Sequence, residues 1–204
     1  KIVLMLSISL LSPPTIRTMV TAVGGPKGGP GKSTLAINIA CSYAQMGHTV
    51  MLIDADETNK HCIRWVENRP PDLHRRLDVC QVTTPEALVA SVRSLADKYD
   101  HLVIDAPPIL KKMTAKIALL ADYMIIPFYP GTFDLYSFED FLHFFSDATD
   151  VRATPLPAAV VFNKEKAVNT RTADLRAAVS GLIEQREQTD IRLLDRGLVD
   201  RNAY

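Results

Sequence analysis

Cysteine is scarce in this sequence, and its cysteines have no paired spacing. The chain of 204 residues contains three, Cys41, Cys62 and Cys80, and no C-x-x-C pair. An odd count without paired spacing supports neither a disulfide framework nor a cysteine-based zinc site, and it fits a reducing cytosol. We therefore interpret all three cysteines as small buried apolar residues.

An excess of charge of either sign is also absent. Lysine and arginine together number 23, aspartate and glutamate together number 23, and the formal net charge is 0. This balance excludes a uniformly basic nucleic-acid binder, although it permits local basic patches. With 47% apolar side chains, the composition indicates one soluble globular domain that can bury a full core.

No apolar run is long enough to cross a bilayer as a helix. The run at the start of the chain, Ile2 to Leu11, is interrupted by two serines and is shorter than the roughly 20 residues that a membrane span needs. No small-x-small cleavage site follows it, as a signal peptide would require. We expect residues 1–18 to be an extension, arising from translation upstream of Met19 or from an artificial addition; a packing arm and a signal peptide are the alternatives. A single domain is predicted over residues 19–204.

Beyond the extension, short β-branched runs alternate with helical patterns. This alternation predicts an α/β fold, a doubly wound and mostly parallel sheet with helices on both faces. Thr84 and Pro85 suit the start of a helix, and Gly47 suits a helix stop. The expected strands are Val20–Gly24, Val50–Asp54, Leu77–Thr83, His101–Asp105, Tyr123–Phe128 and Ala158–Phe162. The expected helices are Ser33–Met46, Lys60–Asn68, Pro85–Lys98, Lys112–Leu120, Leu135–Ser146 and Thr172–Gln188.

A glycine-rich segment joins the first expected strand to the first expected helix. Glycines in such a loop let backbone N–H groups surround a polyphosphate, and the following helix adds the positive end of its dipole. Lys32 supplies positive charge for the outer phosphates, and Ser33 offers a hydroxyl to Mg²⁺. The segment reads Gly24-Gly25-Pro26-Lys27-Gly28-Gly29-Pro30-Gly31-Lys32-Ser33-Thr34. The residues predicted to hold the nucleotide are Gly28, Gly29, Gly31, Lys32, Ser33 and Thr34.

Acidic residues follow two of the expected strands at their carboxyl ends. Asp54 and Asp56 end one of these segments, and Asp105 ends the other. Open α/β sheets bind ligands at this edge. Transfer of a phosphoryl group to water needs one carboxylate near Mg²⁺ and another near the attacking water. A turn or helix cap is the alternative role for any one of these residues.

The segment Lys27 to Thr34 resembles the deviant Walker A loop of the ParA and MinD family of P-loop ATPases, which reads K-G-G-x-G-K-[ST]-[ST]. Pro26 stands where the ordinary Walker A pattern has glycine, so the match is to the variant form. The resemblance extends from about Met19 to about Asp200. It implies that Lys27 reaches across a dimer interface to the nucleotide held by the partner subunit, and that Lys27 and Lys32 both serve catalysis.

The same resemblance assigns roles to residues outside the loop. Asp105, followed by Ala106-Pro107-Pro108, looks like the Walker B and switch II segment, and with Ser33 it is expected near the metal. Asp56 matches the aspartate that orients or activates water, and Asp54 is expected in the outer shell of the metal. Asn163 is expected to contact adenine, with a turn-forming role as the alternative.

The function that this resemblance implies is that of an ATPase that uses ATP and Mg²⁺. It forms a homodimer around two ATP molecules, binds DNA non-specifically in that state, and is reset by slow hydrolysis that a ParB-like adaptor protein stimulates. The expected role is plasmid or chromosome partition in the cytoplasm, in association with the nucleoid. Basic clusters at residues 60–76 and at Lys111, Lys112 and Lys116 are candidate DNA contacts, with a solvated surface as the alternative.

The same nucleotide-binding loop occurs in proteins with three other functions. A membrane-associated positioning ATPase of the MinD kind needs a terminal amphipathic basic helix, which Asp200–Tyr204 do not form, so a membrane is not an expected partner. A nucleotide-dependent accessory factor in conjugative DNA transfer, with negligible turnover, is the other alternative, because Glu57 and Pro30 depart from the residues that many family members have at these positions. An iron–sulfur reductase is disfavoured because the three cysteines have unsuitable positions and spacing.

Overall fold

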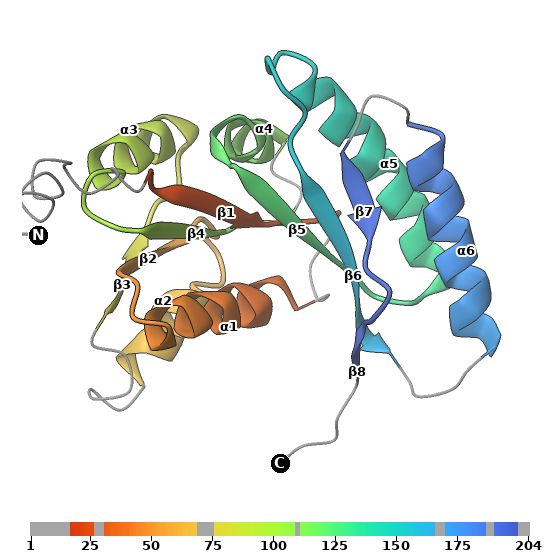
Figure 1. The fold of residues 1–204 in the computed structure, drawn as a ribbon, viewed down its shortest axis with the longest axis horizontal. Helices are drawn as coiled ribbons and strands as arrows, with labels where there is room; N and C mark the ends of the chain where they lie inside the picture. The colour runs from red at the N-terminus through yellow and green to blue at the C-terminus, as the bar shows by residue number, and fades with distance from the viewer. Residues whose placement is uncertain are drawn as a thin grey trace, which may run out of the picture.

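The computed structural model describes residues 17–26, 31–68, 76–108, 111–165, 170–186 and 190–199. Strands and helices alternate along these residues, as the sequence predicts (Figure 1). The strands are β1 (Met19–Val23), β2 (Val50–Asp54), β3 (Leu77–Gln81), β4 (His101–Asp105), β5 (Tyr123–Phe128), β6 (Ala158–Glu165), β7 (Ile191–Leu193) and β8 (Leu198–Val199). The helices are α1 (Lys32–Gln45), α2 (His61–Glu67), α3 (Pro85–Leu95), α4 (Lys111–Leu120), α5 (Thr132–Thr149) and α6 (Thr170–Glu184).

All the strand pairs that the structure describes are parallel. The order across the sheet is β3-β2-β4-β1-β5-β6-β7, and β8 pairs with β6. The register aligns Val23 of β1 and Asp54 of β2 with Asp105 of β4, which lies between these strands. The ends of three neighbouring strands therefore lie side by side at one edge of the sheet.

Two hydrophobic cores cover the two faces of this sheet, and side-chain alternation along the strands divides the residues between them. On β4, Leu102 and Ile104 belong to the larger core, whereas Val103 belongs to the smaller one. Helices α1 and α2 pack on the smaller core, and α3, α4, α5 and α6 pack on the larger one (Figure 1). The helix after β1 and the helix after β4 thus lie on opposite faces, which creates a crevice at the carboxyl ends of these neighbouring strands.

The predicted doubly wound α/β fold is confirmed. Strands β2, β4 and β5 have the predicted bounds, and the hydroxyl of Thr84 accepts a hydrogen bond from the N–H of Ala87 at 3.2 Å, as a helix cap should. Gly47 follows α1 with a φ of 95°, in the region that glycine favours. Two short strands, β7 and β8, were not predicted, because segments of three and two residues are too short to show alternation.

The cysteine prediction is correct for Cys62, which is buried, whereas Cys41 and Cys80 are only partly buried. All three are free thiols, as expected from the sequence. Across the described helices, none combines the length and apolarity that crossing a membrane requires.

Candidate functional site

Gly31 joins the glycine-rich loop to α1. Its φ of 88° is in the left-handed region, and a Cβ at this position would clash with Nδ2 of Asn163. The capping position of α1 is this glycine, which has no side chain to bond the first N–H groups of the helix, and the positive end of the helix dipole lies there. This is the local structure of an anion site. Lys27, Gly28 and Gly29, which the sequence predicts for the rest of the loop, lie outside the described residues.

Lys32 begins α1, and only 6% of the residue is exposed. Burial lowers the pKa of its ammonium group, while the negative charges of Asp105 and Asp56 act in the opposite direction. A buried ammonium group is stable only where opposite charges or hydrogen bonds compensate the loss of water. The structure therefore brings this predicted phosphate-binding lysine together with two of the predicted carboxylates.

Asp105 ends β4 and is 1% exposed. Burial raises the pKa of its carboxyl group to about 6, although hydrogen bonds from Ser33 and Cys62 favour the charged form. Its Oδ2 accepts a hydrogen bond from the thiol of Cys62 at 3.3 Å, whereas its buried Oδ1 has no partner in the described part of the chain. An unpartnered buried carboxylate oxygen is costly unless a ligand or water completes it.

Asp54 ends β2 and is fully buried. Its Oδ1 accepts the N–H of Asp56 at 3.1 Å, and its Oδ2 accepts the N–H groups of Cys62 and Ile63 at 3.0 and 3.4 Å. Burial raises the pKa of Asp54, and these backbone bonds oppose the rise. Asp54 therefore holds the start of α2 against β2, and its predicted place in the outer shell of a metal stays a prediction.

Asp56 lies just beyond β2 and is 8% exposed. Its Oδ1 accepts the N–H groups of Thr58 and Asn59 at 2.9 and 3.2 Å, and its Oδ2 accepts Nδ2 of Asn59 at 2.9 Å. Burial alone would raise the pKa of Asp56, but these bonds outweigh it, and the pKa lies below its usual value. A turn-forming role, the alternative from the sequence, is thus part of what this carboxylate does. The carboxylate of Asp56 is ionised and lies near Lys32, as a group that orients water must be.

The remaining predicted residues surround Gly31. Ser33 is half-buried and its hydroxyl donates a hydrogen bond to the carboxylate of Asp105, while Thr34 is exposed. Asn163 lies within β6, two residues before the strand ends, with its amide group against Gly31. Its Oδ1 accepts a hydrogen bond from the N–H of Lys164 at 2.9 Å. The structure therefore places Asn163 beside the phosphate loop, whereas its predicted contact with adenine stays untested.

Sequence reasoning missed Cys62 and Asn59. Both donate hydrogen bonds to predicted functional carboxylates, at 3.3 and 2.9 Å respectively. Asn59 stands three residues after Asp56, a spacing at which a local bond to an aspartate is common. For Cys62 no such signal exists, because its partner Asp105 is 43 residues away in the sequence.

The donor set around Ser33 and Asp105 suits Mg²⁺, which prefers oxygen ligands. A hydroxyl and a carboxylate with one unpartnered buried oxygen meet there. In the part of the chain that the structure describes, no group of three His, Cys, Asp or Glu residues has the arrangement of a metal site. A magnesium ion held by few protein ligands and by substrate phosphates is compatible with that finding.

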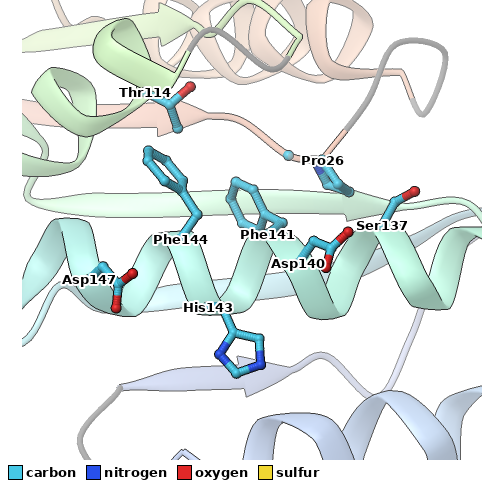
Figure 2. A pocket seen from close by; sticks show the side chains of 9 residues that line it. Pro26, Thr114, Ser137, Asp140, Phe141, His143, Phe144 and Asp147 are labelled. Atoms are coloured by element: carbon cyan, nitrogen blue, oxygen red, sulfur yellow. The ribbon is translucent and has the colours of Figure 1, made fainter.

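A separate groove of about 470 Å³ lies between α4, α5 and the end of β1. Figure 2 shows the rings of Phe141 and Phe144 pointing from α5 toward Thr114 and Pro26, whereas His143 points the other way. Lys32, Asp56 and Asp105 do not line this groove. It therefore adjoins the start of the glycine-rich loop without containing the charged cluster, and the sequence did not predict it.

Known proteins resemble this chain over most of its length. The family model described as ATPase MipZ matches residues 19–177. The chain is 27% identical to maintenance of carboxysome distribution protein A of Halothiobacillus neapolitanus over 190 residues, which cover 92% of this chain and 84% of that protein. It is 22% identical to protein ParA of Rhizobium radiobacter over 185 residues, which cover 91% and 80% of the two chains.

A solved structure supports the same fold. The complex of a Cyanothece McdA variant with ATP superposes with a TM-score of 0.67 at 17% identity, and the match covers 87% of this chain and 83% of that one. The family match extends from β1 through most of α6, and it includes the loop after β1 and all three strand-end aspartates. This chain therefore belongs to the MipZ family of ATPases, within the ParA and MinD group of P-loop ATPases.

Proposed function

We propose that this protein binds ATP with Mg²⁺ at the carboxyl ends of β1, β2 and β4, hydrolyses it slowly, and uses the cycle to partition DNA. It belongs to a family of ParA-like positioning and partition ATPases. One observation carries the proposal. A buried lysine and two buried aspartates, Lys32, Asp56 and Asp105, meet at the start of α1, where the capping position is Gly31.

Each group in this cluster has a task in phosphoryl transfer. The N–H groups at the start of α1 and the ammonium group of Lys32 bind phosphate oxygens. Ser33 and Asp105 are the residues that would hold Mg²⁺, which when bound neutralises charge on the phosphates. Asp56 is ionised and fixed by its own turn, so it can orient a water molecule without rearranging. Asp54 keeps the turn and α2 in place.

Dimerisation is the proposed consequence of ATP binding. By resemblance, Lys27 of one subunit contacts the nucleotide of the other, so ATP favours the dimer because the monomer lacks this contact. The dimer then binds DNA non-specifically and interacts with an adaptor protein that stimulates hydrolysis. We propose that the protein carries out this cycle in the cytoplasm, in association with the nucleoid.

The test measures mass in solution with a non-hydrolysable ATP analogue and Mg²⁺. Wild type is expected as a dimer with the analogue and as a monomer without it. Lys27→Ala should still bind the analogue but stay monomeric, whereas Lys32→Ala should not bind it. Equal loss of nucleotide affinity in both variants would remove the argument for a lysine that acts on the partner's nucleotide.

DNA binding has its own test, retention of the protein on DNA at several salt concentrations. Retention should require ATP and should fall steeply as salt rises, because phosphate contacts release counterions. Retention that is independent of nucleotide or insensitive to salt would contradict the partition role.

A second candidate function is the distribution of a large cellular body other than DNA. The observation that favours it is the 27% identity to a carboxysome distribution protein over 92% of this chain. Both functions use the same nucleotide cycle and differ in the adaptor. Co-purification of adaptor proteins with the ATP-bound dimer would distinguish them, since a centromere-binding adaptor supports partition and an adaptor on a protein shell supports distribution.

A further inference from the structure

Cys62 lies in the first turn of α2, and it is fully buried. It belongs to the smaller core, where a cysteine can act as a small apolar residue. Its thiol, however, is directed at a carboxylate, with Sγ 3.3 Å from Oδ2 of Asp105. The residue therefore has a polar contact that a purely apolar role does not explain.

The backbone of the same residue contacts a second carboxylate. The N–H of Cys62 donates to Oδ2 of Asp54 at 3.0 Å. Asp54 and Asp105 are paired in register on the neighbouring strands β2 and β4. One residue of α2 thus binds the aspartates at the ends of two strands, one through its amide and the other through its thiol.

The direction of the thiol bond follows from the chemistry of the two groups. A thiol carries one S–H and is a weak donor, whereas an ionised carboxylate has no proton to give and can only accept. The thiol of Cys62 is therefore the donor and Oδ2 of Asp105 is the acceptor. A neutral donor of this size satisfies one oxygen of a buried carboxylate without adding a charge to the site.

The second carboxylate oxygen of Asp105, Oδ1, has a different environment. Oδ1 is buried and has no hydrogen-bond partner in the described part of the chain. Cys62 holds Oδ2 and the Ser33 hydroxyl also bonds to this carboxylate, so the group is oriented while Oδ1 stays available for a ligand. Groups that hydrogen-bond to a metal-binding carboxylate commonly influence metal affinity. Their loss lowers metal affinity or activity by roughly 10-fold to 100-fold.

We propose that Cys62 is a positioning residue for Asp105. Its thiol fixes Oδ2, and its position at the start of α2 ties the orientation of Asp105 to Asp54 and to the turn that contains Asp56. The inference rests on the proposed function, because it concerns the Mg²⁺ that accompanies ATP. A change at Cys62 would therefore alter how much Mg²⁺ the protein needs to bind nucleotide.

The experiment measures binding of a fluorescent non-hydrolysable ATP analogue to the full chain as Mg²⁺ is titrated. Cys62→Ala should need about 10 times more Mg²⁺ for half-maximal binding, and Cys62→Ser, which retains a donor, should stay within about 2-fold of wild type. Cys62→Val fills the volume of the cysteine side chain but has no hydrogen-bond donor, so it should behave like Cys62→Ala. This variant keeps the test valid if Cys62→Ala does not fold.

Cys80→Ala is the matched control, since Cys80 is a partly buried thiol on β3 whose raised pKa has burial as its cause. It should leave the Mg²⁺ requirement unchanged. A Cys62→Val protein that folds and binds the analogue with wild-type Mg²⁺ dependence would overturn the positioning role. Failure of the wild-type protein to bind the analogue at any Mg²⁺ concentration would instead contradict the proposed function.

Discussion

Two acidic regions of this molecule differ in how their carboxylates are held. At the sheet edge, Asp54, Asp56 and Asp105 are buried and accept hydrogen bonds from the backbone or from neighbouring side chains. On α5, Asp140 and Asp147 line the groove, are exposed, and have no hydrogen bond or ion pair in the described part of the chain (Figure 2). The first set is fixed in position and the second contributes only charge. We therefore expect nucleotide chemistry to depend on the first set alone.

The largest expected effect is on ATP binding, when the ammonium group of Lys32 beside the aspartates of the sheet edge is removed. Lys32→Ala should weaken ATP binding by about 100-fold or more, because a charge-assisted phosphate contact is worth roughly 1.5–3 kcal/mol and the neighbouring aspartates would then repel the phosphates. Equilibrium binding of a fluorescent ATP analogue measures this. Lys116→Ala, which removes an exposed lysine of α4, is the control and should bind normally. Comparable weakening in both variants would mean that general charge, not position, governs binding.

Removing the water-orienting carboxylate should affect turnover more than binding. Asp56→Ala should bind ATP but hydrolyse it about 100-fold more slowly, because the group that positions the water is lost. Phosphate release under single-turnover conditions gives the rate, and Asp97→Ala at an exposed site serves for comparison. Wild-type turnover in Asp56→Ala would show that another residue positions the water.

The cost of burying a carboxylate gives a prediction on stability. Asp105→Asn should raise the free energy of unfolding of the nucleotide-free protein by up to about 3 kcal/mol at pH 8, since the pKa rises from 3.8 to about 6 on folding. The folded state takes up this proton more readily than the unfolded state. The stability due to Asp105 is therefore present below about pH 4 and is lost as pH rises through 6.

Chemical denaturation of both proteins at several pH values tests this prediction. The advantage of Asp105→Asn should shrink as pH falls from 8 through 6 and vanish near pH 4. Asp147→Asn, at the exposed region, is the matched control and should have no such advantage. If the gain in the free energy of unfolding of Asp105→Asn did not change with pH, the proposed link between stability and the pKa of Asp105 would be wrong.

The smallest effect is expected on α5. The double variant Asp140→Asn and Asp147→Asn should bind ATP within about 2-fold of wild type and change the free energy of unfolding by no more than about 0.5 kcal/mol. Binding and denaturation measurements as above are sufficient. A loss of affinity near that of Lys32→Ala would end the distinction between the two acidic regions.

The sequence predicts the features that depend on periodicity and on strand ends. Apolar runs such as those of β2 and β4 are visible in the sequence pattern, and parallel strands bring Asp54 and Asp105 to one edge of the sheet. The two-residue strand β8 has no period to detect. The contact of Cys62 with Asp105 depends on the packing of α2 against two strands, and no local pattern encodes such packing.

The site was predicted as a set of residues, whereas its hydrogen bonds were not. The oxygens of Asp54 accept hydrogen bonds from backbone N–H groups of the following turn and of α2, which the sequence did not predict. Asn163 lies against Gly31, and only the fold brings these two residues together; its contact with adenine stays a prediction. Residue type and spacing indicate which side chains lie close together. The path of the backbone decides which of their polar atoms already have hydrogen-bond partners.

The most direct measurement is an experimental structure with a non-hydrolysable ATP analogue and Mg²⁺. We predict that the triphosphate contacts Gly31 and Lys32 at the start of α1, with Mg²⁺ beside Ser33 and Asp105. An analogue bound in the groove between α4 and α5, or a metal remote from Asp105, would contradict the account.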